Sequence, residues 1–154
     1  MLKLAGIKKI NIAVLISGNG SNFKSLILNS LKKKSKYEIK LVISNKPTAK
    51  GLGYARKFKI KKKIINYLNK RIAEKTILDE LKKNKIDLVC LAGFMKILSN
   101  NLIKNFKGKI INIHPSLLPK YKGLNTHQRA LNNREKYSGW DSLGRTIVMV
   151  LEAK

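Results

Sequence analysis

The chain contains few of the residues that cross-link or interrupt a fold. It has one cysteine, three prolines and two histidines among 154 residues. The lone Cys90 lies in the apolar run Leu88–Leu91, so we expect a buried, reduced thiol and neither a disulfide nor a nucleophile. Two histidines and one cysteine form no recognisable ligand spacing, and we therefore predict no metal site.

Long hydrophobic runs and flexible linkers are also missing. No apolar stretch approaches the roughly 20 residues of a membrane helix, and residues 1–6 lack the apolar core of a signal peptide. A cytoplasmic protein with no membrane contact is expected. Without a Pro/Gly/Ser-rich linker or an internal repeat, 154 residues with 44% hydrophobic content predict one packed domain.

Acidic residues are scarce, with 8 Asp and Glu against 34 Lys and Arg, and the net charge is +26. Such a charge can attract polyanions. However, arginine occurs only at positions 56, 71, 129, 134 and 145, and lysines are spread over residues 32–34, 57–63, 82–85 and 104–109. This dispersed, lysine-rich pattern, accompanied by abundant Ile and Asn, favours a solvated surface over a nucleic-acid interface.

Short apolar runs alternate with amphipathic segments. We predict strands at 11–17, 39–44, 64–65, 87–92 and 109–113, the third of them weak. Helices are predicted from Ser21 or Asn22 to Leu31, over 51–58, from Ala73 to about Asn84, from a cap at Ser99 to Phe106, and over 126–133. This order predicts an α/β fold, with a mostly parallel sheet and helices on both faces.

Polar and glycine-rich segments follow the strands that should meet at one edge of the sheet. The turn Ser17–Asn22 has two glycines and leads into a helix, an arrangement that suits phosphate. The segment 92–98 presents apolar side chains and backbone amides that could hold a flat heterocycle. Asn112 and His114 have the same strand parity, so both should leave one face and together could stabilise an oxyanion.

The motifs at residues 17–22, 91–98 and 112–127 together resemble glycinamide ribonucleotide formyltransferase, the folate-dependent transformylase of purine biosynthesis. The resemblance implies an open, Rossmann-like fold that transfers a formyl group from 10-formyltetrahydrofolate to the amine of glycinamide ribonucleotide. Both partners are small molecules, 10-formyltetrahydrofolate being a co-substrate, and no metal is implied.

The resemblance also implies roles for particular residues. The catalytic pair would be Asn112 and His114; for His127, on the last predicted helix, we ourselves expect a packing or hydrogen-bonding role. The substrate phosphate would bind at Gly20, Ser21 and Asn22, and the folate at Arg71, Met95, Lys96, Ile97, Leu98 and Asn112. A family arginine before the third helix falls at either Lys70 or Arg71.

After Gly139 the sequence departs from the family pattern. The family continues with a strand carrying a His and then an Asp that polarises the catalytic imidazole, and by register that Asp position falls near Val150. Asp141 and Glu152 are the available acids, but neither has the expected context. We therefore divide the chain into a Rossmann-like domain, 1–139, and an atypical tail, 140–154, produced by a frameshift or premature stop or by a natural replacement.

Two expectations follow from the atypical tail. Without the Asp the imidazole loses the group that favours its charged form, so slow or absent turnover is expected. A sheet that is incomplete at its C-terminus is expected to expose an apolar edge, through which copies of the chain could associate.

Three other functions remain open. Methionyl-tRNA formyltransferase and formyltetrahydrofolate deformylase share the Asn-x-His-Pro centre, and a tRNA substrate would suit the positive charge. A basic nucleic-acid-binding domain without catalysis would show salt-sensitive RNA binding and no response to folate. A non-catalytic fragment would retain partial ligand binding.

Overall fold

The fold is known from a computed structural model, which describes residues 8–113 and the backbone of 148–151. The strands are β1 (Ile10–Ile16), β2 (Tyr37–Ser44), β3 (Lys61–Ile64), β4 (Leu88–Leu91), β5 (Lys109–Ile113) and β6 (Val148–Leu151). The helices are α1 (Ser21–Ser30), α2 (Leu52–Lys57), α3 (Lys70–Lys83) and α4 (Asn100–Asn105). The predicted helix at 126–133 lies outside the described residues.

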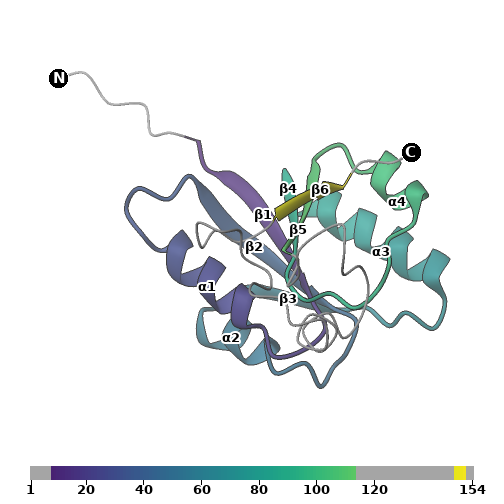
Figure 1. Cartoon of the computed structure of the whole chain (residues 1–154), viewed down its shortest axis with the longest axis horizontal. Helices are drawn as coiled ribbons and strands as arrows, with labels where there is room; N and C mark the ends of the chain where they lie inside the picture. Colours follow the sequence, from purple (N-terminus) through teal and green to yellow (C-terminus); the bar gives the residue numbers. More distant parts are fainter. Residues whose placement is uncertain (1–7, 114–147, 152–154) are drawn as a thin grey trace, which may run out of the picture.

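The six strands form one sheet in the order β3-β2-β1-β4-β5-β6 (Figure 1). Strands β1 to β5 pair in parallel, and β6 pairs antiparallel with β5. The chain crosses over between β3 and β4, which puts the switch point between β1 and β4, and such sheets bind ligands beyond the carboxyl ends of the strands at that point. The expected mostly parallel, Rossmann-like fold is confirmed.

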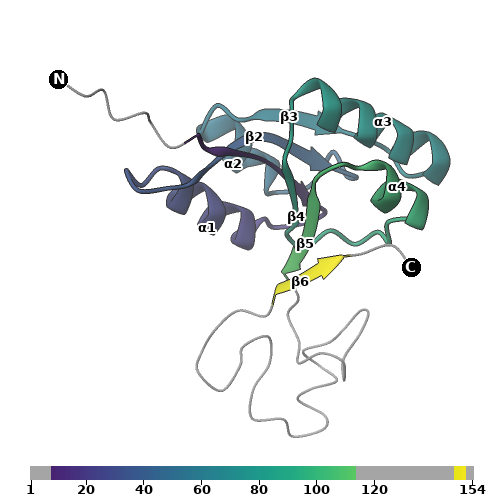
Figure 2. The same cartoon turned by 90° about the horizontal axis from the view of Figure 1, so that it is seen from above.

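Both faces of the sheet are covered by helices (Figure 2). On one face, α1 and α2 bury Phe23, Ile27, Leu52 and Ala55 against alternate strand residues such as Val14, Val42 and Cys90. On the other, α3 and α4 bury Ala73, Ile77, Leu81 and Leu102 against Leu15, Ile43, Leu91 and Ile110. This double coverage explains why the central strands are continuous apolar runs in sequence.

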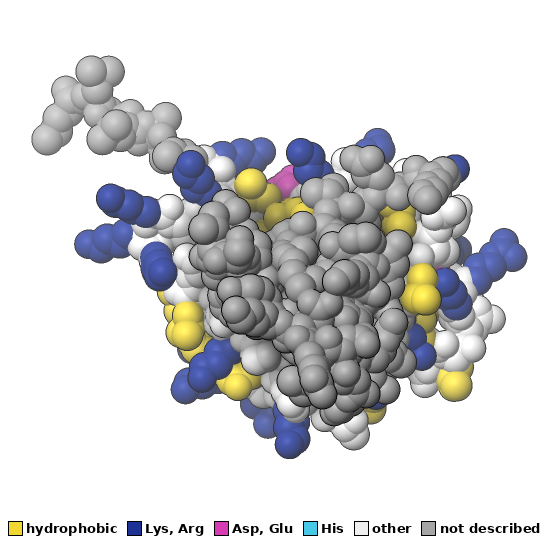
Figure 3. All heavy atoms as spheres, viewed as in Figure 1, with side chains coloured by type: hydrophobic (Ala, Val, Ile, Leu, Met, Phe, Trp, Pro, Cys, Tyr) yellow, Lys and Arg dark blue, Asp and Glu magenta, His cyan; other side chains and the backbone are white. Residues whose placement is uncertain are grey.

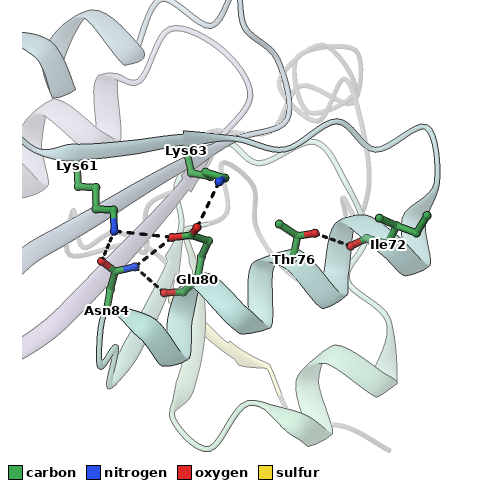
Figure 4. Close-up of polar contacts among 6 residues, drawn as sticks. All are labelled: Lys61, Lys63, Ile72, Thr76, Glu80 and Asn84. Carbon is green, nitrogen blue, oxygen red and sulfur yellow. Dashed lines mark hydrogen bonds and ion pairs between the residues drawn. The ribbon is translucent and has the colours of Figure 1, made fainter.

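Strand β3 differs from its prediction at 64–65. It spans Lys61–Ile64, and every one of its residues is exposed. A run of three lysines carries no hydrophobic signal, so the pairing with β2 alone defines this edge strand. From α3, Glu80 reaches Lys63 at 3.3 Å and Lys61 at 3.9 Å, and Asn84 accepts a 2.9 Å hydrogen bond from Lys61 (Figure 4). Charged side chains of this kind discourage pairing with another strand.

Strand β6 lies in the segment that sequence analysis described as an atypical tail, for which no element was predicted. Its pairing places Met149 opposite Asn112 and Val148 opposite Ile113. The outer edge of β5 is therefore occupied, and β6 forms this edge of the sheet. The expected association of copies through a sheet edge stays a prediction. No helix among residues 8–113 is long and apolar enough to span a membrane.

Candidate functional site

Three predicted motifs begin at one edge of the sheet. Leu15 pairs with Leu91 across β1 and β4, and Leu91 pairs with Asn112 across β4 and β5. The turn that starts at Ser17, the loop that starts at Ala92 and the end of β5 therefore emerge side by side. The amide N–H of Ala92 also donates to the carbonyl of Leu15 at 2.9 Å, which extends the pairing into the loop.

Ser17 ties these loops together. Its backbone N–H donates to Gly93 O at 3.1 Å, and its hydroxyl accepts the N–H of Met95 at 2.8 Å. The same hydroxyl donates to Asn45 Oδ1, 2.5 Å away in the turn after β2. Ser17 is buried, so its hydroxyl acts as a structural junction among three strand ends. Sequence analysis included Ser17 in a motif but missed this role.

Helix α1 begins differently from its prediction. Its N-cap is Gly20, with φ of 74°, and no side chain caps the first turn, so neither Ser21 nor Asn22 is the cap. A β-carbon on Gly20 would lie 2.6 Å from Gly51 Cα, and the N–H of Gly51 donates to Gly18 O at 3.0 Å. This close backbone contact with the start of α2 requires glycine, and no local sequence pattern shows it.

The N-terminus of α1 has the character of an anion site. The first N–H groups of a helix lack intrahelical acceptors, and here no side chain and no acidic residue in the first turn compensates them. Ser21 and Asn22 are exposed, as the predicted phosphate role would require. The helix dipole adds partial positive charge at this end.

The loop 93–98 presents apolar side chains to solvent. Met95 is 58% exposed and Ile97 is 86% exposed, whereas Leu98 is buried in the core with Leu102. Lys96 is exposed between them. Of the four residues predicted to contact folate in this loop, the first three are therefore free to meet a ligand, and Leu98 supports the loop from below.

A buried carboxylate holds the far end of this loop. Glu74 on α3 accepts hydrogen bonds from the backbone N–H of Ser99, at 2.8 Å, and from the Ser99 hydroxyl. Ser99 caps α4 as predicted, by accepting the N–H of Leu102 at 3.2 Å. Sequence analysis missed Glu74, although its spacing of three, four and seven residues from Ile77, Leu78 and Leu81 places it on the apolar face of α3.

An aromatic pair lies beside this carboxylate. The rings of Tyr67 and Phe94 meet edge to face with their centroids 5.7 Å apart. Burial, followed by the negative charge of Glu74, raises the pKa of the Tyr67 hydroxyl. That buried hydroxyl has no hydrogen-bond partner among the described residues. The segment before α3 and the loop after β4 thus pack as one unit.

Asn112 lies on the α3 and α4 side of the sheet. It shares strand parity with Ile110, which packs in that core, whereas Ile111 packs against the opposite one. Its side chain is partly exposed. His114 and His127, as well as the acids Asp141 and Glu152, lie outside the described residues, so the Asn112–His114 pair remains a prediction.

A groove of about 800 Å³ runs between α3 and α4 and starts near this edge. Its lining includes both Lys70 and Arg71, the two candidates for the basic folate-side residue, as well as Glu74 and Ser99. Lys70 Nζ lies 3.9 Å from Glu74 Oε1. A smaller hollow of about 380 Å³ lies at the other end of α3, lined by Lys82, Lys85 and Lys107 among others, far from the predicted motifs.

On the one face seen in Figure 3, positive charge is dispersed. In Figure 3 the Lys and Arg side chains surround the visible margin in separate groups, with apolar side chains between them. The visible part of this face therefore agrees with a solvated basic surface.

The family model for formyl transferases matches residues 10–153. The chain belongs to the formyl transferase family. It is 43% identical over 133 residues to phosphoribosylglycinamide formyltransferase of Escherichia coli, covering 84% of this chain and 63% of that protein. It is 46% identical over 148 residues to the bovine trifunctional purine biosynthetic protein adenosine-3, covering 94% of this chain and 14% of the bovine protein.

Solved structures of formyl transferases agree with this assignment. The crystal structure of phosphoribosylglycinamide formyltransferase from Brucella melitensis superposes with a TM-score of 0.81 at 38% identity, covering 93% of this chain and 72% of the other. The chain spans about two thirds of the length of its bacterial relatives. The family match continues beyond Gly139, the point at which the recognisable motifs end.

Proposed function

We propose that the chain is a phosphoribosylglycinamide formyltransferase of low turnover, a class of enzyme that transfers the formyl group of 10-formyltetrahydrofolate to the amine of glycinamide ribonucleotide. The main support is that the carboxyl ends of β1, β4 and β5 lie side by side at one edge of the sheet, in a chain more than 40% identical to relatives named for this activity. We also propose that it works in the cytoplasm on these small molecules.

Each ligand has a proposed place at this edge. The ribonucleotide phosphate would accept hydrogen bonds from the N–H groups at the start of α1, at Gly20, Ser21 and Asn22. The pterin ring would lie against the exposed part of the loop 93–98, and Arg71 or Lys70 would meet the anionic end of the folate. The reacting atoms would then meet near Asn112.

The proposed reaction needs charge stabilisation and one proton transfer. The amine nitrogen bonds to the formyl carbon, and the carbonyl π electrons move to oxygen. Asn112, as a hydrogen-bond donor, and protonated His114 would stabilise that oxyanion. As the carbonyl re-forms, the bond from carbon to N10 breaks and N10 takes the proton of His114. The former amine nitrogen then loses a proton to the imidazole.

Calorimetric titration tests ligand binding separately from turnover. We expect the chain to bind glycinamide ribonucleotide and 10-formylfolate, a stable analogue of the co-substrate with an oxidised pterin ring. Glycinamide riboside, which lacks the 5′-phosphate, should bind at least tenfold more weakly, because it has no anion for α1. Failure of both the ribonucleotide and 10-formylfolate to bind would refute the proposal, and salt-sensitive RNA binding in their place would favour the nucleic-acid alternative.

Formyl transfer to the ribonucleotide tests the chemistry. We expect any turnover above the uncatalysed rate to fall by about 100-fold or more in Asn112→Ala, because one oxyanion donor is removed. Asn29→Ala, an exposed asparagine on α1 remote from β5, is the matched control and should keep the wild-type rate. Equal rates in wild type and Asn112→Ala would remove Asn112 from the mechanism.

A further inference from the structure

Glu74 is the only buried charged residue within 8–113, with 4% of its surface exposed. Removing a carboxylate from water is costly unless hydrogen bonds and opposite charge compensate it. The described part of the chain gives Glu74 three such contacts: the N–H and the hydroxyl of Ser99, and the more distant ammonium of Lys70. Two of the three come from one residue at the end of the loop 93–98.

Ser99 is fully engaged by this arrangement. Its backbone N–H and its only hydroxyl hydrogen go to the two oxygens of Glu74, while its hydroxyl oxygen accepts the N–H of Leu102. These three hydrogen bonds fix both the side chain and the backbone of Ser99, so the position of Ser99 is set by the position of Glu74 on α3. A charged acceptor makes these hydrogen bonds stronger than neutral ones.

The loop is held at both ends and exposed in the middle. Ser17 holds Gly93 and Met95 through two hydrogen bonds, and Glu74 holds Ser99. Between these anchors Ile97 remains 86% exposed. An apolar side chain held in water favours collapse of the loop, so the anchors oppose that collapse and keep a contact surface ready for a ligand.

Phe94 links the same loop to the start of α3. Its ring packs edge to face on Tyr67, three residues before Lys70. Burial and then the negative charge of Glu74 raise the pKa of the Tyr67 hydroxyl, so this hydroxyl lies near the carboxylate. The stretch from Tyr67 to Glu74, which leads into α3, thus supports both Phe94 and Ser99. A shift of α3 would move both supports of the loop together.

We propose that Glu74 is a positioning residue for folate binding: its carboxylate fixes Ser99 and thereby keeps residues 93–98 in the conformation that accepts the co-substrate. This inference rests on the proposed function for the identity of the ligand. It assigns Glu74 no contact with substrate. Its effect is to preorganise a surface on the α3 and α4 side, while the ribonucleotide phosphate would bind at α1, on the other side of the sheet.

The decisive variant is Glu74→Gln, with Glu80→Gln as its matched control. Both change a carboxylate of α3 into an amide, but Glu80 faces Lys61 and Lys63 on β3 (Figure 4) and makes no hydrogen bond or ion pair with the loop among the described residues. In Glu74→Gln we expect 10-formylfolate to bind about tenfold more weakly, because an amide in place of the carboxylate loses one charged hydrogen bond to Ser99. Ribonucleotide affinity should be unchanged, and Glu80→Gln should bind both ligands like the wild type.

Substitutions at Ser99 test the same link from the other side. Ser99→Ala should reproduce the loss of folate affinity, and Ser99→Thr, which keeps the hydroxyl, should restore wild-type binding. Wild-type folate affinity in Glu74→Gln would overturn the inference. Equal losses of folate and ribonucleotide affinity would also overturn it, because they would indicate general destabilisation of the fold.

Hydrogen exchange at the amides of residues 93–99 separates this inference from the proposed function, because it needs no ligand. We expect exchange at least tenfold faster in Glu74→Gln than in the wild type or in Glu80→Gln. Faster exchange in a protein that binds neither the ribonucleotide nor 10-formylfolate would refute the proposed function and retain the loop-holding role of Glu74. Unchanged exchange would refute the role of Glu74, whatever the ligand binding shows.

Discussion

The hydroxyl of Ser17 lies 2.5 Å from Oδ1 of Asn45, and this hydrogen bond joins the ends of β1 and β2. The same hydroxyl accepts the N–H of Met95 from the loop after β4. Parallel strands place their carboxyl ends at one edge, but their loops can still diverge. In this chain a buried serine holds three of those loops together, so the geometry of the candidate site depends on one side chain.

Ser17→Ala should therefore destabilise the protein. The substitution leaves Asn45 Oδ1 and the N–H of Met95 without their partner in a partly buried region, which typically costs about 1–3 kcal/mol. Urea denaturation measures the change in the free energy of unfolding. Ser25→Ala removes a hydroxyl on the exposed face of α1 whose one hydrogen bond among the described residues goes to Ser21 O, and it should stay within about 0.5 kcal/mol of wild type. Equal losses in the two variants would contradict the junction role of Ser17.

Gly20→Ala should also destabilise the chain, for a backbone reason. Gly20 has φ of 74°, and an added β-carbon would approach Gly51 Cα to 2.6 Å. We expect a loss of about 2 kcal/mol or more, since left-handed strain and a backbone clash add together. Thermal unfolding followed by circular dichroism is a suitable measurement.

Gly53→Ala is the control for this substitution. Gly53 lies within α2, and its β-carbon would meet no atom within 4 Å. Alanine is a better helix former than glycine, so this variant should gain up to about 1 kcal/mol. A destabilised Gly53→Ala protein would contradict the assignment of α2, and a tolerated Gly20→Ala would contradict the close contact between the two turns.

Local patterns in the sequence were sufficient to predict the helices and strands whose buried residues recur at regular spacing. Continuous apolar runs predicted β1, β2 and β4, and Ser99 was correctly predicted to cap α4. The edge strand β3 was placed three residues too late, because Lys61, Lys62 and Lys63 show no hydrophobic alternation. Its position follows from backbone pairing with β2, which is a property of the folded sheet.

The details of the candidate site depended on contacts between distant residues. The cap of α1 was predicted at Ser21 or Asn22 because those side chains suit a cap, but the contact of Gly20 with Gly51 determines the backbone there. Likewise, Glu74 and Ser99 are 25 residues apart and meet only when α3 and α4 pack together. Periodicity places Glu74 on the buried face of α3 without identifying its partner.

The contact of Glu80 with β3 predicts a pH-dependent contribution to stability. Partial burial alone would raise the pKa of the Glu80 carboxyl, but the hydrogen bond from Lys63, the charges of Lys63 and Lys61 and the Asn84 amide hold the pKa below its ordinary value. A lowered folded-state pKa means that the contribution is present above the unfolded pKa of about 4.3 and is lost as the pH falls through the folded value.

Glu80→Gln should therefore lower the free energy of unfolding at pH 7 by about 0.5–1 kcal/mol, a modest value because both lysines are about half exposed. The difference from wild type should disappear near pH 3. Asp79→Asn, a change on the same helix at a residue without an ion pair in the described ranges, should show a smaller difference at pH 7. A difference for Glu80→Gln that persists at pH 3 would rule out the ionic explanation.

Cys90 should be nearly inert in the folded protein. Burial raises the pKa of its thiol to about 11, so at pH 8 only about one molecule in a thousand carries a thiolate, against about one in four for a free thiol. Ellman's reagent should label native protein no faster than the protein unfolds, and should label it within minutes in concentrated urea.

Because the unfolded chain releases the thiol proton of Cys90 at lower pH than the folded chain, the thiol's contribution to the free energy of unfolding should fall as the pH rises from about 8.5 towards 11. Rapid labelling of native protein at pH 8 would mean that β4 is accessible to solvent, which would contradict its burial beneath α1 and α2 in the centre of the sheet.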